Sequence, residues 1–453
     1  MADIEKTRKN LEARGFDVTI VNNAQEAMDY LDSQIDNTTV GVSGSYTLQH
    51  FEGFPDRLSH HNAVFWHWFN FVDTHNAIEA DAYITSANAL AETGELVTLD
   101  SRGNRSSSML FGHNRVYFVM SRNKIMPDYD SAVAYAKNIA CPLKAMHTHK
   151  DVPCVPKIGG QDVHICSDCD AEQRVCKTML THWRRPDFIA KAEVVIILED
   201  LGEDPRDLTQ EMLSIAEKTK VTPSTGIPAD YEPDMEKTRE NLEKHGFKVL
   251  IMDTKEQAAN YLNEQIDNTT VGISGSVTIQ KLVFGDDEEE VPGRAFGDRL
   301  AHHNTMFWHW YNFVDTHNAI RAEAYITSAN AIAETGQIVN VDSRGNRSSS
   351  LLFGHDRLFI VAGKNKIVPT LEDARWRAKN VCAPANARRM NGIRQRNGKP
   401  GYPAEMGCVA NDHALCNDCN CGQRICKTEL IHYRRPDFIK EATVILLKEE
   451  MGI

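Results

Sequence analysis

The segments QIDNTTVGVSGS (34–45) and QIDNTTVGISGS (265–276) differ at one position and decide the fold of this chain. Each is typical of a β-strand that runs through Ser-Gly-Ser into a helix. Further matches follow in the same order along the chain: ITSANALAETG (84–94) with ITSANAIAETG (326–336), SRGNRSSS at 101–108 and 343–350, and RRPDFI at 184–189 and 434–439. The sequence therefore predicts one domain duplicated in tandem.

Within the first copy, apolar runs rich in β-branched residues alternate with helical patterns. The runs lie at 18–21, 38–42, 82–86, 95–99, 115–120 and 193–198, and the helical patterns at 24–34 and 129–139. This alternation predicts the α/β class, with two tandem copies of a Rossmann-like, mostly parallel sheet domain and a Cys-rich C-terminal segment in each. We expect a first domain at 1–202, a linker rich in proline, glycine and polar residues at 203–232, and a second domain at 233–453.

The charge balance, the apolar runs and the cysteine count indicate which partners and which cellular compartment to expect. The 453 residues include 63 acidic and 50 basic side chains, a formal charge of −13, which argues against nucleic acid as a partner. The N-terminus has no apolar signal segment and no run approaches ~18 apolar residues, so we expect a cytoplasmic protein without membrane insertion. The 11 cysteines are then expected to be thiols or metal ligands, not disulfides.

Two loops that follow strands carry candidate anion-binding residues. Small residues in the Ser-Gly-Ser loop let backbone amides approach an anion at a helix start, although a tight capped turn is the alternative. The GNR segment adds a cation and hydroxyls suited to a carboxylate or phosphate, with an ordinary polar loop as the alternative. The predicted substrate-binding residues are Ser43, Ser45, Asn104 and Arg105, with Ser274, Ser276, Asn346 and Arg347 in the second copy.

Glu92 and Glu334 of the two AETG segments are the candidate catalytic groups. A carboxylate at a strand end can act as a base or a nucleophile. The alternative is a turn with a left-handed glycine and the glutamate in solvent. Because the carboxyl ends of parallel strands meet at one edge of the sheet, we expect each glutamate in the same pocket as the serines and the arginine.

The segments at 60–78 and 302–320 contain four histidines each among aromatic residues. Read as helices, they have a spacing that does not fit a metal site cleanly, and packed helices with structural histidines are the favoured interpretation. If one histidine of each copy has a functional role, His67 and His309 are preferred.

Each copy ends in a four-cysteine set with the fixed pattern C-x2-C-x6-C and a first cysteine at variable distance. The predicted ligands are Cys154, Cys166, Cys169 and Cys176, and Cys408, Cys416, Cys419 and Cys426. Four thiolates suit Zn²⁺ or an iron–sulfur cluster, and the single CxxC flanked by isolated cysteines favours iron–sulfur. Buried thiols without a metal are the alternative. Cys141, Cys382 and Cys421 have no counterpart in the other copy and are not expected to be ligands.

SGSYT, ITSANALAETG, SRGNR and the cysteine tail together resemble the lactate-utilisation (LUD) domain family, and the resemblance covers both copies. It implies a fold similar to the ribose-5-phosphate isomerase, glucosamine-6-phosphate deaminase and CoA transferase superfamily, in which a Gly/Ser-rich loop holds phosphate or CoA. Some LUD proteins belong to iron–sulfur systems that oxidise lactate to pyruvate. This chain lacks the fused ferredoxin-type double cluster of that pattern.

The leading hypothesis is a metal-binding protein of organic-acid metabolism, in or beside an iron–sulfur oxidation of lactate, with a small anionic metabolite as ligand and redox subunits as partners. One alternative is an isomerase or acyl/CoA transferase that uses Glu92 or Glu334 and has structural zinc. The other alternative is a non-catalytic assembly or binding subunit.

Overall fold

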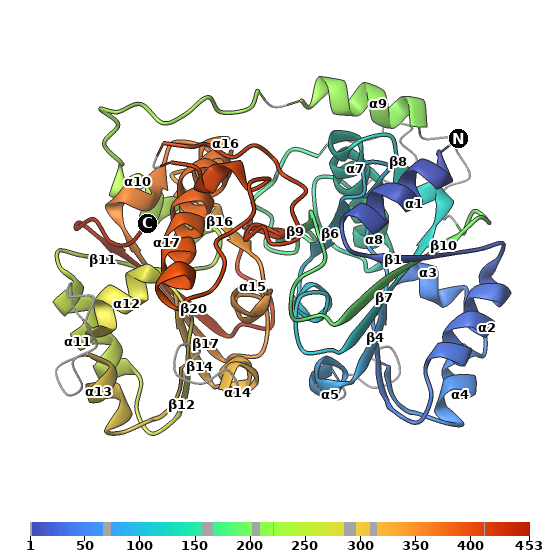
Figure 1. Ribbon diagram of the computed structural model, residues 1–453, viewed down its shortest axis with the longest axis horizontal. Coiled ribbons are helices and arrows are strands. Elements are labelled where there is room, and N and C mark those ends of the chain that lie inside the picture. The colour runs from blue at the N-terminus through green and yellow to red at the C-terminus, as the bar shows by residue number, and fades with distance from the viewer. Residues whose placement is uncertain are drawn as a thin grey trace. The chain divides into compact units, whose positions relative to one another are not determined.

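The computed structural model describes residues 2–66, 74–155, 166–201, 209–220, 222–284, 296–308, 315–411 and 413–453. It contains two compact units, Met1–Val221 with Ser343–Gly345 and Lys427–Glu429, and Thr222–Asp342 with Asn346–Cys426 and Leu430–Ile453. Helices and strands are named as in Figure 1.

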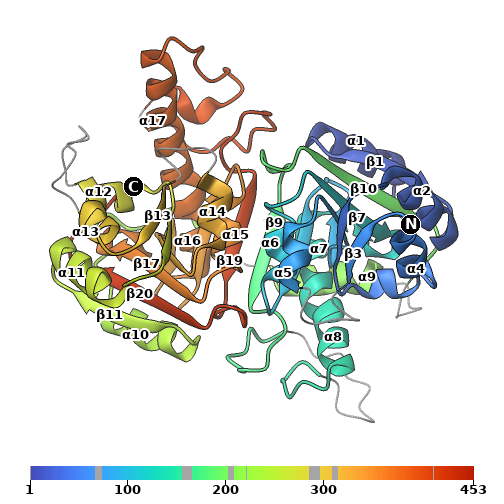
Figure 2. The same ribbon diagram turned by 90° about the horizontal axis from the view of Figure 1, so that it is seen from below.

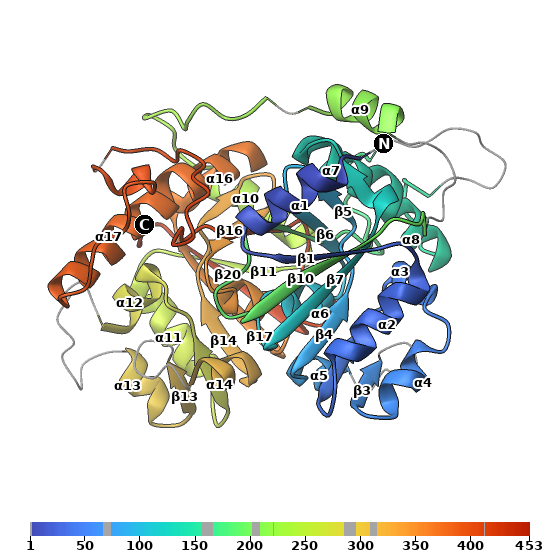
Figure 3. The ribbon, with the colours of Figure 1, turned by 45° about the vertical axis from the view of Figure 1, so that its right-hand side comes forward.

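Each unit contains a six-stranded sheet in which every pairing is parallel, visible for the first unit in Figure 3. In the first unit its order is β1 (Asp17–Val21), β10 (Lys191–Ile197), β7 (Arg115–Ser121), β4 (Ala82–Thr85), β2 (Thr39–Val42) and β3 (Ala63–Trp66). In the second unit it is β11 (Lys248–Met252), β20 (Glu441–Leu447), β17 (Arg357–Gly363), β14 (Ala324–Thr327), β12 (Thr270–Ile273) and β13 (Thr305–Trp308). The predicted α/β class with two Rossmann-like domains is confirmed.

Shorter strands form additional, mixed pairings that the sequence did not predict. They are β5 (Ala89–Ala91), β6 (Leu96–Asp100), β8 (Ile125–Met126) and β9 (Thr178–His182), with β15 (Ala331–Ala333), β16 (Ile338–Asp342), β18 (Ile367–Val368) and β19 (Thr428–His432). β5 and β6 are antiparallel partners, as are β15 and β16. The AETG segment is therefore a hairpin turn outside the parallel sheet, and Gly94 adopts the left-handed φ of 96° that this turn requires.

The helices of the first unit are α1 (Ile4–Ala13), α2 (Ala24–Gln34), α3 (Tyr46–Gln49), α4 (Phe54–Ser59), α5 (Thr74–Glu79), α6 (Asn104–Ser108), α7 (Tyr129–Tyr135), α8 (Cys141–His147) and α9 (Thr209–Lys218). Those of the second are α10 (Met235–Lys244), α11 (Lys255–Gln265), α12 (Val277–Phe284), α13 (Phe296–Ala301), α14 (Asp315–Arg321), α15 (Asn346–Ser350), α16 (Leu371–Arg377) and α17 (Ala383–Arg396). Polar N-caps start several of them: the Asp3 side chain accepts from the Lys6 amide, and Thr254 and Gln257 form a capping box.

Apolar side chains of helices cover one face of each parallel sheet. In the first unit, Leu31 of α2 and Leu58 of α4 are fully buried against strand residues such as Val40 and Ile84. In the second, Leu262 of α11 packs into the equivalent cluster with residues of α12 and α13, and Figure 2 shows these three helices grouped beside the strands. No helix of the described residues is long and apolar enough to cross a bilayer.

Between α7 and α8, and between α16 and α17, the backbone passes through a π-helical turn, η3 (Ala136–Ala140) and η5 (Ala378–Cys382). Pro142 and Pro384 follow these turns, and each removes one amide donor from the helical ladder. Both copies thus break the helix at the same place, one helix before the cysteine-rich segment.

The helix expected in the histidine-aromatic segments is wrong for residues 63–66, which form β3. The β-branched and aromatic residues there pair in parallel with β2, Thr39 opposite Ala63. His67 and His309 lie outside the described residues. The predicted linker contains the helix α9, which packs on α7.

Candidate functional site

The Ser-Gly-Ser loops follow β2 and β12 at the carboxyl ends of the parallel strands. The first serine is fully buried and hydrogen-bonds to a threonine of the neighbouring strand, Ser43 to Thr85 at 2.9 Å and Ser274 to Thr327 at 2.8 Å. The second serine, Ser45 or Ser276, precedes the helix and is also buried. The first serine therefore ties the loop to the sheet, and the second stands at the helix start.

The predicted arginines occupy matched positions in the two units. Arg347 Nη2 donates to Asn330 Oδ1 at 2.9 Å and to the Val341 carbonyl at 2.6 Å. Arg105 Nη2 donates to Asn88 Oδ1 at 3.0 Å and to the Leu99 carbonyl at 2.6 Å. These bonds fix one end of each guanidinium group and so orient the side chain.

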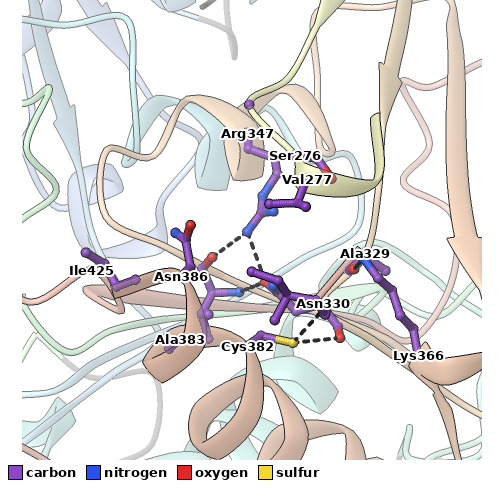
Figure 4. Close-up of a pocket in the computed structure, with 13 residues that line it drawn as sticks. Ser276, Val277, Ala329, Asn330, Arg347, Lys366, Cys382, Ala383, Asn386 and Ile425 are labelled. Carbon is purple, nitrogen blue, oxygen red and sulfur yellow. Dashed lines mark hydrogen bonds between the residues drawn. The ribbon is translucent and has the colours of Figure 1, made fainter. Parts of the chain in front are cut away.

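In the second unit, a cavity of about 60 Å³ brings Ser276 and Arg347 together. Figure 4 shows the arginine reaching toward Asn330 from above, with Cys382 below it and Lys366 at the side. The cavity is lined by Gly275, Ser276, Val277, Ala329, Asn330, Val341, Arg347, Lys366, Cys382, Ala383, Asn386, Ile425 and Ile453. None of these described lining residues has an acidic side chain.

Lys366 is a functional candidate that the sequence analysis missed. Only 3% of it is exposed, and its ammonium group donates to Thr278 Oγ1 at 2.7 Å, Ser328 Oγ at 3.0 Å and the Ala329 carbonyl at 3.0 Å. Burial lowers the pKa of Lys366 to about 7. Lys124 makes the corresponding bonds in the first unit, to Thr47, Ser86 and Ala87. The repeated tripeptide Asn-Lys-Ile was the signal in the sequence.

Glu92 and Glu334 lie elsewhere. Glu334 Oε1 accepts from the Asp234 amide at 2.8 Å, and Oε2 forms an ion pair with Lys237 at 2.8 Å. Tyr231 adds a hydroxyl donor, and together these partners outweigh burial and lower the pKa of Glu334. Glu92 repeats the pattern at the start of α1, with the Asp3 amide at 2.9 Å and Lys6 at 2.9 Å. Each carboxylate thus holds the first turn of a helix and does not line the described cavity.

Asn104 and Asn346 begin the short helices α6 and α15 and are buried, at 6% and 4% exposure. They do not line the cavity described above, although Arg347 is the next residue along the chain. Of the predicted second-copy residues, only Ser276 and Arg347 line this cavity. Lys366 and Cys382, which the sequence did not predict as site residues, line it as well.

The four cysteines of the first copy share one small cavity. It is lined by Lys137, Val152, Cys154, Cys166, Ser167, Cys169, Arg174, Val175 and Cys176. Burial and the neighbouring thiols raise the pKa of Cys154 to about 11. Arg174, 3% exposed, donates through Nε to Cys176 Sγ at 3.3 Å and through Nη1 to the Cys169 carbonyl at 2.7 Å.

The second copy repeats this arrangement. Arg424 donates to Cys426 Sγ at 3.2 and 3.4 Å and to the Cys419 carbonyl at 2.6 Å. The Asp418 amide donates to Cys416 Sγ at 3.4 Å, in a turn where Asp418 has a left-handed φ of 49°. Burial and the other three thiols of the set raise the pKa of Cys408 to about 11. Each set therefore combines four sulfur donors with a buried guanidinium group.

Within the described part of the chain, no group of three or more histidine, cysteine, aspartate or glutamate side chains is arranged closely enough to hold a metal ion. The thiols of the first copy share a cavity without converging on one point. The chemistry of the four cysteines nevertheless suits a soft metal ion. Four thiolates need compensating positive charge and N–H donors to sulfur, and Arg174 and Arg424 supply both.

These sites lie in two successive α/β domains with parallel sheets, each carrying a cysteine-rich segment. The model of the LUD domain family matches residues 4–180 and 235–398, more than half of the chain. The chain belongs to the LUD domain family, in two tandem copies. A solved structure, described as a crystal structure of a DUF162 family protein from Deinococcus radiodurans, is 12% identical over 47% of this chain and 95% of that chain, with a TM-score of 0.23. No curated protein matches the chain.

Proposed function

We propose that the cavity of the second unit binds a small organic anion, with a carboxylate the best fit. The observation that carries this proposal is that Arg347 and Lys366 both line one cavity whose lining includes no acidic side chain among the described residues. Arg347 is half-buried, and Lys366 is buried with hydroxyl and carbonyl partners but no acidic partner in this lining. A buried charge without a counter-charge is costly. An anionic ligand supplies the missing partner.

The protonation of Lys366 also supports an anionic ligand. Burial lowers its pKa to about 7, so the ammonium form is disfavoured in the absence of a ligand. A bound carboxylate beside it favours the ammonium form and raises the pKa again. Binding of the anion is therefore coupled to protonation of the lysine.

Arg347 is positioned to contribute directional hydrogen bonds. Its Nη2 group is used by Asn330 and Val341. Among the described residues, its Nε and Nη1 groups have no partner, and arginine offers two parallel donors to a carboxylate. The small cavity volume favours a ligand of few non-hydrogen atoms, consistent with an organic acid of low mass.

The contacts of Glu92 and Glu334 favour a structural role for both residues. Each carboxylate accepts from a helix-terminal amide and pairs with a lysine of the same helix, so it is already engaged as a helix anchor. This weakens the alternative of an isomerase or CoA transferase that uses these glutamates. A binding subunit without catalysis remains the second candidate, because an anion site needs no nucleophile.

We further propose that each four-cysteine set binds a metal centre, an iron–sulfur cluster or Zn²⁺. Arg174 and Arg424 would offset the negative charge of four thiolates, and the common cavity of the first set supports a single centre. Such a centre would supply either electron transfer or a structural crosslink between the cysteine loop and the domain. Membership of the LUD family supports, as part of this proposal, a role in organic-acid metabolism, in or beside a lactate-type oxidation.

Calorimetric titration of the full chain with lactate, pyruvate and acetate tests the anion site. We expect at least one of these carboxylates to bind to the wild type and an Arg347→Met variant with unchanged melting to lose at least tenfold in affinity. Equal affinity in wild type and variant would reject the site. Iron, sulfide and zinc analysis of anaerobically purified protein tests the metal centre, and absence of all three would reject it.

A further inference from the structure

The cavity of the second unit also contains a thiol that the proposed anion site does not use. Cys382 is the last residue of η5, lines the cavity and is 2% exposed. The AKN segments align (136–138 with 378–380), so Ala140 occupies the corresponding position in the first copy. The thiol is thus a feature of the second unit, and no role as a metal ligand is expected for it.

Two cationic side chains lie near this thiol, which also donates to a main-chain oxygen of Ile453 at 3.6 Å. Arg377, 5% exposed, donates through Nη1 to Cys382 Sγ at 2.8 Å and to the Asn330 carbonyl at 2.6 Å. Lys366 faces the same cavity, as Figure 4 shows. Cys382 Sγ therefore accepts a hydrogen bond from a buried guanidinium group in a cavity that Lys366 also lines.

We propose that Cys382 and Lys366 form a nucleophile and proton-carrier pair that acts on a small carboxylate bearing an electrophilic carbonyl carbon. This inference rests on the proposed anion site, because Arg347 is required to hold the carboxylate. It adds a covalent activity that anion binding alone does not include.

The covalent step conserves atoms and electrons. As the carboxylate binds, the neutral amine of Lys366 gains its proton from Cys382 Sγ, and the sulfur lone pair forms a bond to the carbonyl carbon. The π electrons of the carbonyl group move to its oxygen, which receives the proton back from the Lys366 ammonium group. The product is a thiohemiacetal or thiohemiketal, and the step is reversible and needs no oxidant.

Lys366 suits this exchange. Its pKa of about 7 lets both protonation states exist near neutral pH, which a group that accepts and returns a proton requires. After burial, which lowers this pKa, the largest influence is the charge of Cys382, which raises it, so the two groups are electrostatically linked. The thiol donates to the Asn330 carbonyl at 3.2 Å, which holds the sulfur in place before reaction.

The test compares the alkylation of Cys382 by iodoacetate and by iodoacetamide. Iodoacetate has the carboxylate that Arg347 would bind, and iodoacetamide has a neutral amide in its place. The full chain is treated with each reagent, and peptide mapping measures the rate at Cys382, with Cys141 of the first unit as internal reference. We expect iodoacetate to modify Cys382 at least tenfold faster than iodoacetamide. Arg347→Met should abolish this preference, and Lys366→Met should slow both reagents.

Cys382→Ala is the matched control, because alanine occupies the corresponding position in the first copy and the variant is expected to fold. If Cys382 is unmodified in the native protein, or iodoacetamide reacts faster and Arg347→Met changes nothing, the nucleophile is rejected. Calorimetry separates the two proposals. Carboxylate binding that persists in wild type and Cys382→Ala alongside an unreactive thiol rejects the nucleophile alone, whereas loss of carboxylate binding in the wild type rejects the anion site as well.

Discussion

The ammonium group of Lys366 donates a hydrogen bond to the hydroxyl of Thr278 at 2.7 Å. This bond joins the turn after β17 to the helix that follows the Ser-Gly-Ser loop, two segments 88 residues apart in the chain. In the first unit, Lys124 and Thr47 make the same bond at 2.6 Å. The lysine is thus a repeated element of the loop that forms the candidate anion site.

Anion binding to the second unit should weaken as the pH rises. The pKa of Lys366 is lowered to about 7 by burial, with the neighbouring charges of Cys382, Arg377 and Arg347 also acting on it. Below pH 7 the ammonium group attracts the anion, and above pH 7 the neutral amine does not. Carboxylate affinity measured from pH 6 to 9 should therefore fall by about tenfold per pH unit above 7, the limit for one coupled proton.

Lys366→Met should remove that pH dependence and weaken carboxylate binding at pH 6. Lys364→Met is the matched control, because Lys364 lies in the same short turn, η4 (Lys364–Lys366), but is 36% exposed and does not line the cavity. The control should retain both the affinity and its pH profile. Equal behaviour of the two variants would contradict the role of the buried lysine.

Glu334→Gln should reduce the stability of the second unit by about 1–3 kcal/mol, the usual effect of weakening a buried charge-assisted hydrogen bond. The pKa of Glu334 is lowered in the folded protein by Lys237, Tyr231 and the Asp234 amide acting against burial. Its stabilising contribution is therefore complete above the unfolded pKa and is lost as the pH falls through the folded pKa. Urea unfolding at pH 7 and pH 4 should show the difference between wild type and variant shrinking at the lower pH.

The same variant should bind carboxylates with unchanged affinity, because Glu334 does not line the cavity. A large loss of carboxylate binding per folded molecule in Glu334→Gln would show that Glu334 contributes to the anion site.

Replacing Cys426 by serine should lower the metal content by one centre and reduce the melting temperature. Cys421→Ser is the control, because Cys421 has no counterpart in the first copy and is not expected to be a ligand. Arg424→Met should also lower metal retention during dialysis against a chelator, since the guanidinium group donates to Cys426 Sγ at 3.2 Å. Metal content that is identical in wild type and Cys426→Ser would contradict the second centre.

The parallel sheets and the helix α2 were predictable from the sequence, since each is a local pattern of apolar residues bounded by a cap or a turn. The position of Glu92 was not. The short strand β5 reverses direction through AETG into β6, and so leaves the edge where the parallel strands end. Sequence spacing does not reveal which sheet a three-residue strand joins.

The cavity was only partly predictable. Ser276 and Arg347 follow strands of recognisable pattern, but Lys366 lies in a short polar turn whose only signal was its repetition in both copies. Cys382 was set aside because the first copy has alanine there. Comparison of the two copies does not single out a position at which they differ. Such a position can nevertheless be where the two domains have diverged in function.

The most direct test of the account is the affinity of a small carboxylate for the wild-type chain and for Arg347→Met, measured by calorimetry at pH 6 on protein whose melting temperature is matched. The central claim is that the cavity of the second unit lined by Arg347 and Lys366 is an anion site. It predicts binding to the wild type and a loss of at least tenfold in the variant. Carboxylate binding that is absent from the wild type, or present and unchanged in the variant, would contradict it.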